Sequence, residues 1–167
     1  LLELADIELR RRMVRIHQDI QFGLPDLWVD RILIEQVLIN LLKNAAESID
    51  AANRHAIDRR IQLKVVLTEH SGHPVVLFSV TDTGKGLSDE VIDKVFEAFF
   101  TTKREGMGIG LNLCRTIIEA HQGRMQAENL YNGSDVTGCR FSFWLPVVNA
   151  ASVSPSGQSM STTLMES

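Results

Sequence analysis

The segment "VTDTGKGLSDE", residues 80–90, decides how this chain is interpreted. The apolar run 75–80 predicts a buried strand, and this strand ends at Asp82, which is followed by Gly84 and Gly86. Glycine adopts backbone angles that other residues rarely adopt, and it leaves the backbone open to close approach. A plain β-turn uses the same residue types. The alternative is a binding site, in which the carboxylate accepts a hydrogen bond from an amino group such as the exocyclic amine of adenine.

Around this segment, the hydrophobic pattern predicts a mixture of helices and strands. We expect helices at about 4–14, 31–52, 88–98 and 109–121, and strands at about 15–22, 61–69, 74–82, 124–130 and 139–146. Asp30 and Ser88 are expected to cap the helices that follow them, and Gly123 is expected to end the last helix. Because strands and helices do not alternate strictly, the predicted class is α+β, a sheet with helices packed on one face.

The composition is typical of a globular domain. The chain has 167 residues, of which 44% are apolar and 23% are charged, and this length allows one domain with its own core. The formal net charge of −4 does not indicate a nucleic-acid partner, because nucleic-acid-binding domains are usually basic. No apolar stretch reaches the roughly 20 residues that span a bilayer, and no signal peptide is recognisable. We therefore expect a cytoplasmic domain, with membrane anchoring of a longer parent protein left open.

The chain is expected to have three parts. Residues 1–14 are predicted to be the end of an upstream helical element or a linker, since the sequence starts without methionine and reads as a fragment. Residues 15–147 form the predicted folded domain. Residues 148–167 are rich in Ser and Thr and are expected to be disordered. Two cysteines, Cys114 and Cys139, do not indicate a disulfide framework, and Cys114 is expected in the core.

The helix predicted at 31–52 carries a narrow polar stripe on an otherwise apolar surface. On a helical wheel centred on Asn40, the polar neighbours within about 60° are Gln36, Lys43, Asn44 and Glu47. A solvated helix face is one interpretation of the stripe. However, Asn is a poor residue for a helix interior, and the amide oxygens of Asn40 and Asn44 could hold Mg²⁺ that is shared with substrate phosphates. Lys43 beside them could neutralise a phosphate.

A second glycine-rich turn, "GMGIGLNL" at 106–113, opens the helix predicted at 109–121. Free backbone N–H groups at a helix start can face an anion. The segment is neither a P-loop nor a dinucleotide-binding fingerprint, because its spacing is GxGxG and no GxxxxGK[ST] occurs. Combined with the two other features, it indicates a nucleotide site that places adenine at Asp82, phosphates at this turn and Mg²⁺ at Asn40 and Asn44.

Four motifs, in order and spacing, resemble those of histidine kinases. "NLLKNAAES" resembles their N box, "DTGKG" their G1 box, "VFEAFFTTK" their F box and "GMGIGL" their G2 box, while "GCRFSFWLP" resembles their closing strand. The resemblance covers residues 20–146 and is nearest to sensor kinases of the nitrogen-regulation and oxygen-sensing type, judging by "FFTTK" and "EAHQG". It implies the Bergerat-type ATP-binding fold, a two-layer α/β sandwich in which a mixed sheet of about five strands carries about three helices on one face.

The resemblance also implies roles for individual residues. In the N box, Asn44 would be the Mg²⁺ ligand, Asn40 its neighbour in the metal site, and Lys43 a phosphate contact. The residues assigned to the adenine pocket are Asp82, Gly84 and Gly86. The residues assigned to the lid anchor are Phe96, Phe99 and Phe100, with the lid itself at 101–107. The residues assigned to the phosphate side are Lys103, Arg104, Gly106, Gly108, Gly110 and Leu111.

Two departures from the family pattern stand out. Cys139 follows Gly138 where the family usually places a threonine near the adenine. In addition, none of the five histidines is followed by Glu or Asp, as the family's phosphate-accepting histidine is. The chain therefore reads as a catalytic domain without its acceptor histidine.

The sequence thus predicts the ATP-binding catalytic domain of a sensor histidine kinase, which transfers the γ-phosphoryl group of ATP to a histidine on a separate dimerisation domain. The predicted cofactors are ATP and Mg²⁺. The predicted partners are the dimerisation domain of the same parent, a homodimer, and a response regulator. One alternative is an ATP-hydrolysing relative, but such relatives place a Glu base where this chain has Asn40, which cannot take a proton. A second alternative is a non-catalytic nucleotide-binding module that regulates a partner.

Overall fold

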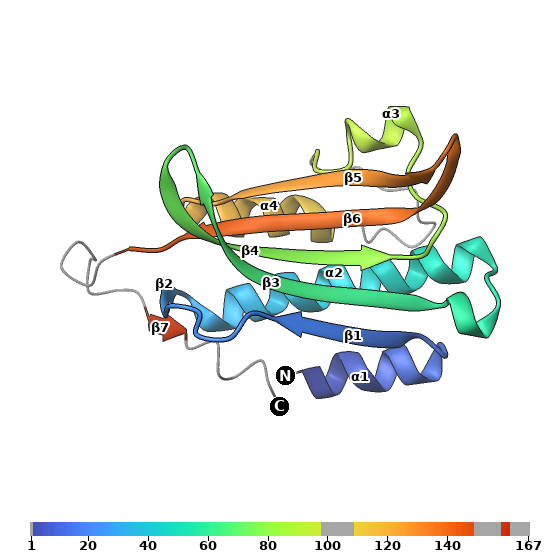
Figure 1. Cartoon of the computed structure of the whole chain (residues 1–167), viewed down its shortest axis with the longest axis horizontal. Coiled ribbons are helices and arrows are strands. Elements are labelled where there is room, and N and C mark those ends of the chain that lie inside the picture. The colour runs from blue at the N-terminus through green and yellow to red at the C-terminus, as the bar shows by residue number, and fades with distance from the viewer. Residues whose placement is uncertain (1, 98–108, 149–157, 161–167) are drawn as a thin grey trace.

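The computed structural model describes residues 2–97, 109–148 and 158–160, and a five-stranded sheet forms one layer of the domain (Figure 1). The strands lie in the order β1 (Arg15–Ile20), β3 (Arg60–His70), β4 (His73–Asp82), β6 (Asp135–Pro146) and β5 (Arg124–Asn132). β1 pairs with β3 in parallel, and the other three neighbouring pairs are antiparallel. The sheet is therefore mixed, and the predicted α+β class is confirmed.

Two helices, α2 (Arg31–Ala52) and α4 (Ile109–Ala120), lie on the same face of this sheet (Figure 1). The apolar residues of α2 recur every three or four positions and are buried, as expected for a helix with one face on a core. Asp30 caps α2 as predicted, because its side-chain oxygen accepts the backbone N–H of Leu33 at 3.2 Å. The two-layer sandwich is thus confirmed. None of the described helices is long and apolar enough to cross a membrane.

The first helix, α1 (Leu2–Arg11), packs against α2 and contributes to the same core. Leu9 and Val14 are only 3% and 6% exposed and belong to the continuous cluster of buried apolar residues. Burial of an aliphatic side chain of this size contributes about 1.5–3 kcal/mol. The domain boundary at residue 14 stays a prediction, but the helix before it is held by core packing.

The helix predicted at 88–98 is shorter in the structure. α3 spans Asp89–Ile92, and its cap is the predicted one, since the Ser88 hydroxyl accepts the N–H of Val91 at 3.3 Å. Residues 93–96 form turns. Because α3 buries none of its residues, packing gives little support to a longer helix, and isolated short helices are marginal.

Gly123 follows the end of α4, as predicted. The helix ends at Ala120, and the backbone N–H of Gly123 donates to the carbonyl of Ile118 at 2.9 Å. The residue with left-handed backbone angles is Gln122, with φ of 66°. Gly123 is also needed for close packing, because a Cβ there would lie 2.1 Å from the carbonyl oxygen of Trp144 on β6. α4 therefore ends where its chain must pass tightly against the sheet.

Three short elements were not predicted: β2 (Leu27–Val29), the 3₁₀ helix η1 (Ala56–Asp58) and β7 (Gln158–Met160). β2 pairs with β7 in an antiparallel manner. Three residues of the tail that was predicted to be disordered thus form a strand, which gives the backbone of β2 a hydrogen-bonding partner.

Candidate functional site

The site is built around Asp82, the last residue of β4. Asp82 pairs with Ile61 on β3 and Cys139 on β6, and it is only 3% exposed. Its carboxylate accepts the backbone N–H of Gly84 at 2.8 Å, and the backbone N–H of Cys139 also donates to it. An ionised carboxylate offers about four acceptor positions. Asp82 can therefore still accept hydrogen bonds from a ligand that reaches it.

The electrostatic environment of Asp82 is unusual for a structural carboxylate. Burial raises the pKa of Asp82 to about 6, although the N–H groups of Gly84 and Cys139 favour its charged form. Within the described part of the chain, no positive side chain lowers this pKa. A buried carboxylate without a counter-charge costs stability, and strongly perturbed groups of this kind cluster at functional sites. The structure thus favours the binding-site interpretation of this segment over the plain β-turn.

The two glycines after Asp82 serve different purposes. Gly84 lies against the last turns of α2, where a Cβ would be 2.2 Å from the Oγ of Ser48. Gly86 has φ of 71°, and a Cβ there would meet the side chains of Val136 and Asn129 at 2.5 and 2.8 Å. The positive φ expected for both glycines therefore occurs at Gly86, while Gly84 is required for close approach to the helix. This approach brings the strand-end turn against Ser48, the residue that follows Glu47 of the predicted polar stripe.

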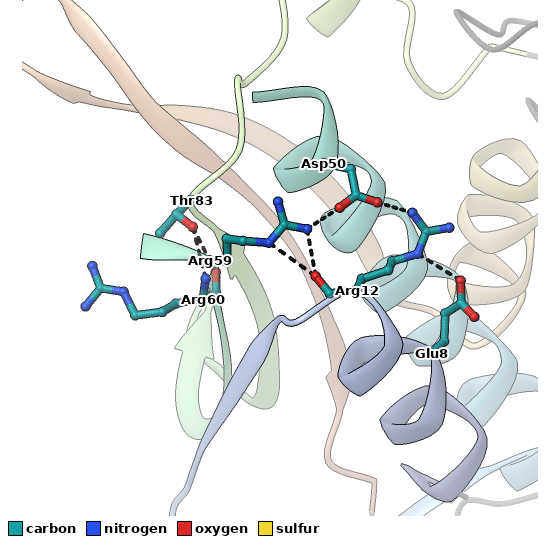
Figure 2. A network of polar contacts seen from close by, with 6 residues as sticks. All are labelled: Glu8, Arg12, Asp50, Arg59, Arg60 and Thr83. Atoms are coloured by element: carbon teal, nitrogen blue, oxygen red, sulfur yellow. Dashed lines mark hydrogen bonds and ion pairs between the residues drawn. The ribbon is translucent and has the colours of Figure 1, made fainter. Parts of the chain in front are cut away.

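Two residues that the sequence did not single out fix this turn. The hydroxyl of Thr83 accepts the backbone N–H of Arg60 at 3.1 Å (Figure 2), and it donates to the carbonyl of Asp58. On the other side, Asn129 of β5 accepts the N–H of Leu87 at 2.8 Å and donates to the carbonyl of the same residue. Side chains thus hold both ends of the glycine turn. Sequence spacing alone could not predict these contacts.

Within the polar stripe of α2, Asn40 lies against α4. Gln36 donates to the side-chain oxygen of Asn40 at 3.3 Å, and the amide nitrogen of Asn40 donates to the sulfur of Cys114 on α4 at 3.5 Å. A Cβ added at Gly110, in the first turn of α4, would lie 3.9 Å from that same amide nitrogen. The structure therefore brings Asn40 together with the described end of the second glycine-rich turn, although more than 60 residues separate them in the sequence.

For Asn44 and Lys43, the other predicted site residues of the stripe, the structure gives the burial but does not test the predicted roles. Asn44 is half-buried, one helical turn after Asn40. Lys43 is exposed. The pKa of Glu8 on α1 is lowered mainly by its hydrogen bond with Arg12, and the charge of Lys43 adds to this lowering. Lys43 therefore lies within electrostatic reach of α1, and its contact with phosphate stays a prediction. In the described ranges there is no group of three or more His, Cys, Asp or Glu residues that could hold a metal.

The lid region lies mostly outside the described residues. The predicted residues that lie outside the described part of the chain are Phe99, Phe100, Lys103, Arg104, Gly106, Gly108 and the lid 101–107 as a whole. Phe96 is described, and its ring meets that of Phe141 edge-on, with centroids 6.0 Å apart. Leu111 is partly buried against the core. Phe96 is thus anchored on the sheet, and its role in holding a lid stays a prediction.

Cys139 occupies a core position beside Asp82. It is 2% exposed, and burial together with the nearby Asp82 charge raises the pKa of its thiol to about 12. A thiol with this pKa remains protonated at neutral pH. Cys139 therefore acts as a small apolar residue and is no reactive group.

Comparison with known proteins shows which family the sequence matches. The family model described as "Histidine kinase-, DNA gyrase B-, and HSP90-like ATPase" matches residues 29–149. The sensor protein FixL of Bradyrhizobium diazoefficiens is 38% identical over 140 residues, which cover 84% of this chain and 26% of that protein. The sensor histidine kinase ZraS of Escherichia coli K12 is 32% identical over 146 residues, or 87% of this chain and 28% of that protein. The chain thus spans about a quarter of the length of these two relatives.

Solved structures show the same similarity. The catalytic domain of the histidine kinase ThkA, in a nucleotide-free form, superposes with a TM-score of 0.66 and 31% identity, covering 87% of this chain and 86% of that one. Full-length ShkA, solved in complex with AMPPNP, superposes with a TM-score of 0.69 and 26% identity, covering 89% of this chain and 28% of that one. The fold is therefore that of a histidine kinase catalytic domain, and one such neighbour holds an ATP analogue.

Proposed function

Because the chain belongs to the family of histidine kinase-, DNA gyrase B- and HSP90-like ATPases, we propose that it binds Mg-ATP and transfers the γ-phosphoryl group to a histidine on a separate domain. Its similarity to sensor histidine kinases over more than four-fifths of its length supports this branch of the family. The relatives are longer proteins, so the chain would supply the catalytic part of such a kinase.

The observation that carries the proposal is the buried carboxylate of Asp82. It has backbone donors at Gly84 and Cys139, no positive partner among the described residues, and capacity for further donors. The exocyclic amine of adenine would supply such a donor, and a hydrogen bond to a charged acceptor contributes about 1.5–3 kcal/mol. Guanine has a carbonyl at the equivalent position and would bring an acceptor to an acceptor. Asp82 would thus select adenine nucleotides.

The phosphates and Mg²⁺ would lie between α2 and the start of α4. Asn44, with Asn40 as its neighbour, would hold Mg²⁺ through amide oxygens, and the contact between Asn40 and Cys114 keeps the two helices together at this point. Mg²⁺ would supply charge neutralisation on the phosphates. The residues proposed on the phosphate side are Lys43, Lys103, Arg104, Gly106, Gly108, Gly110 and Leu111.

In the transfer step, an imidazole nitrogen of the acceptor histidine attacks the γ-phosphorus. An N–P bond forms, the bond from the γ-phosphorus to the bridging oxygen breaks, and ADP leaves with that electron pair. Such transfer needs positioning and charge neutralisation more than covalent chemistry from the protein. Asn40 stands where hydrolysing relatives place a Glu, and an amide cannot take a proton from water. Hydrolysis should therefore be slow.

The proposed partners follow from this role. The acceptor would be a histidine on the dimerisation domain of the same parent, which would be a homodimer, and a response regulator would receive the phosphoryl group next. Since ATP is the substrate, the domain would work on the cytoplasmic side, whatever anchors its parent.

Calorimetric titration with ATP and GTP tests the proposal. ATP should bind, GTP should bind at least about tenfold more weakly, and Asp82→Ala should lose a similar factor for ATP. Asp93→Ala, at an exposed position beyond α3, is the matched control and should bind ATP as the wild type does. Equal affinity for ATP and GTP would contradict adenine recognition at Asp82.

A further inference from the structure

A network of polar contacts outside the proposed site joins α1 to the turn that carries Asp82. Figure 2 shows it from Glu8 and Arg12 at the end of α1, through Asp50 on the last turns of α2, to Arg59, Arg60 and Thr83. None of these residues was given a role by the sequence motifs. The network has two halves, which meet in the segment 58–60, from the last residue of η1 to the first residue of β3.

The first half fastens this segment to the end of α1. Arg59 donates two hydrogen bonds to the carbonyl oxygen of Arg12, at 3.2 Å from Nε and 2.8 Å from Nη2. That carbonyl follows the last turn of α1, where the helix itself supplies no donor. A guanidinium with a fixed fork suits such a double contact, which a lysine could not reproduce.

Asp50 strengthens the same junction. Its two carboxylate oxygens bind the guanidinium groups of Arg12 and Arg59 separately, and Arg12 also bonds to Glu8 at 2.8 Å (Figure 2). Burial pushes the pKa of Asp50 upward, but the hydrogen bonds from Arg59 and Arg12 outweigh it and hold the pKa below its usual value. α1, the end of α2 and the start of β3 are thus tied at one carboxylate.

The second half fastens the same segment to the adenine side of the proposed site. The Thr83 hydroxyl bonds to the carbonyl of Asp58 and to the N–H of Arg60 at 3.1 Å, and Arg54 donates from Nε to the Thr83 carbonyl at 3.2 Å. Thr83 follows Asp82 directly in the chain. Any shift of the segment 58–60 therefore acts on the backbone that aims the Asp82 carboxylate.

We propose that Arg59 and Thr83 are positioning residues for adenine binding, and that this network couples the docking of α1 to the affinity of the site for nucleotide. The inference rests on the proposed function. Coupling between two sites is reciprocal, so nucleotide should in turn hold α1 more firmly on the domain. An upstream element that moves α1 would then change nucleotide affinity without contacting the site.

The chain offers a matched pair of variants to test this. Arg59→Gln removes the guanidinium contacts, whereas Arg60→Gln makes the same change in charge at the next residue, whose exposed guanidinium has no hydrogen bond or ion pair with the described part of the chain (Figure 2). Titration with ADP should show affinity about five- to tenfold lower for Arg59→Gln, in the range of typical coupling energies. Arg60→Gln should stay within about twofold of the wild type.

Thr83 provides a second, independent pair. Thr83→Ser keeps the hydroxyl and should bind ADP as the wild type does, whereas Thr83→Val keeps the shape but loses the bonds to Asp58 and Arg60 and should bind several-fold more weakly. This pair decides the question even if Arg59→Gln fails to fold at the assay temperature. Equal ADP affinities of Thr83→Val and Thr83→Ser, both folded, would overturn the proposal.

Hydrogen exchange distinguishes positioning from a role in stability alone. ADP should slow exchange of the α1 backbone amides in the wild type and in Arg60→Gln, and this effect should shrink in Arg59→Gln. Unchanged α1 exchange in a wild type that binds ADP would refute the coupling while leaving the proposed function intact. A wild type that does not bind ADP at all would refute both.

Discussion

Asp82→Asn should make the protein more stable and less able to bind ATP. The wild-type carboxylate is 3% exposed and its pKa is raised to about 6 by burial. A raised pKa means that the folded state binds the proton more tightly than the unfolded state, so the stability of the wild type falls as pH rises from about 4 to about 6 and stays low above that. The amide of Asn carries no charge and escapes this cost.

The size of the effect follows from the pKa. A rise of about two units from the ordinary value corresponds to about 3 kcal/mol in the free energy of unfolding at neutral pH. Asn accepts hydrogen bonds less strongly than a carboxylate, and the weaker bonds from Gly84 and Cys139 offset about 1 kcal/mol. We therefore expect Asp82→Asn to be more stable than the wild type by about 1–2 kcal/mol at pH 8, with a difference that shrinks below pH 6.

Urea unfolding of both proteins between pH 4.5 and pH 8 measures this difference. Asp50→Asn is the control of opposite sign: the pKa of Asp50 is lowered, so its loss should destabilise the protein at neutral pH, and the loss should fade only as pH falls below the ordinary Asp range. A destabilising charge at Asp82 is excluded if Asp82→Asn is less stable than the wild type at pH 8, or if the difference between them does not depend on pH.

Three further substitutions probe the rest of the site. Gly84→Ala places a Cβ 2.2 Å from the Oγ of Ser48. It should lower the free energy of unfolding in urea by about 1–3 kcal/mol and should remove most of the ATP affinity in calorimetry. ATP affinity equal to that of the wild type would show that this turn does not contribute to ATP binding. Asn129→Leu leaves the backbone of Leu87 without its side-chain partner and should lower the free energy of unfolding by about 1–3 kcal/mol in the same assay. Asn132→Leu, at an exposed position on the same strand, should lower it little. Equal losses would show that the hydrogen bonds between Asn129 and Leu87 do not stabilise the protein. Asn44→Ala should weaken calorimetric ATP binding in the presence of Mg²⁺ more than in its absence, and equal weakening in both conditions would exclude a metal role.

The sequence predicted the local structure around the candidate site well, because local pattern carries that information. An apolar run that stops at Asp82 indicates a strand end, and the structure places this carboxylate at the end of β4 and in the core, while its role in binding stays a prediction. The helical wheel separated Asn40 from the apolar side of α2, and in the structure Asn40 lies against α4, where it contacts Cys114 and approaches Gly110. Periodicity is a property of residues that are close in the sequence, so it can be recognised before the fold is known.

What the sequence could not predict are contacts between distant segments. The bond from Asn129 to Leu87 joins residues 42 positions apart, and the bond from Arg12 to Asp50 joins residues 38 apart. Their residue types are common at surfaces, so nothing local marks them. The same holds for β2, whose three residues are too few to show a period and whose partner β7 lies near the other end of the chain.

An assay of phosphoryl transfer in trans tests whether this chain is the catalytic domain of a histidine kinase. The chain is incubated with γ-labelled Mg-ATP, alone and with the histidine-bearing dimerisation domain of its parent, and the products are separated. We expect no label on this chain, very slow release of phosphate, and acid-labile, base-stable label on the dimerisation domain. Asp82→Ala should abolish this label on the dimerisation domain. Rapid phosphate release without transfer would contradict this expectation and move the protein to the hydrolysing branch of the fold, and label on this chain itself would reveal an acceptor among its own five histidines.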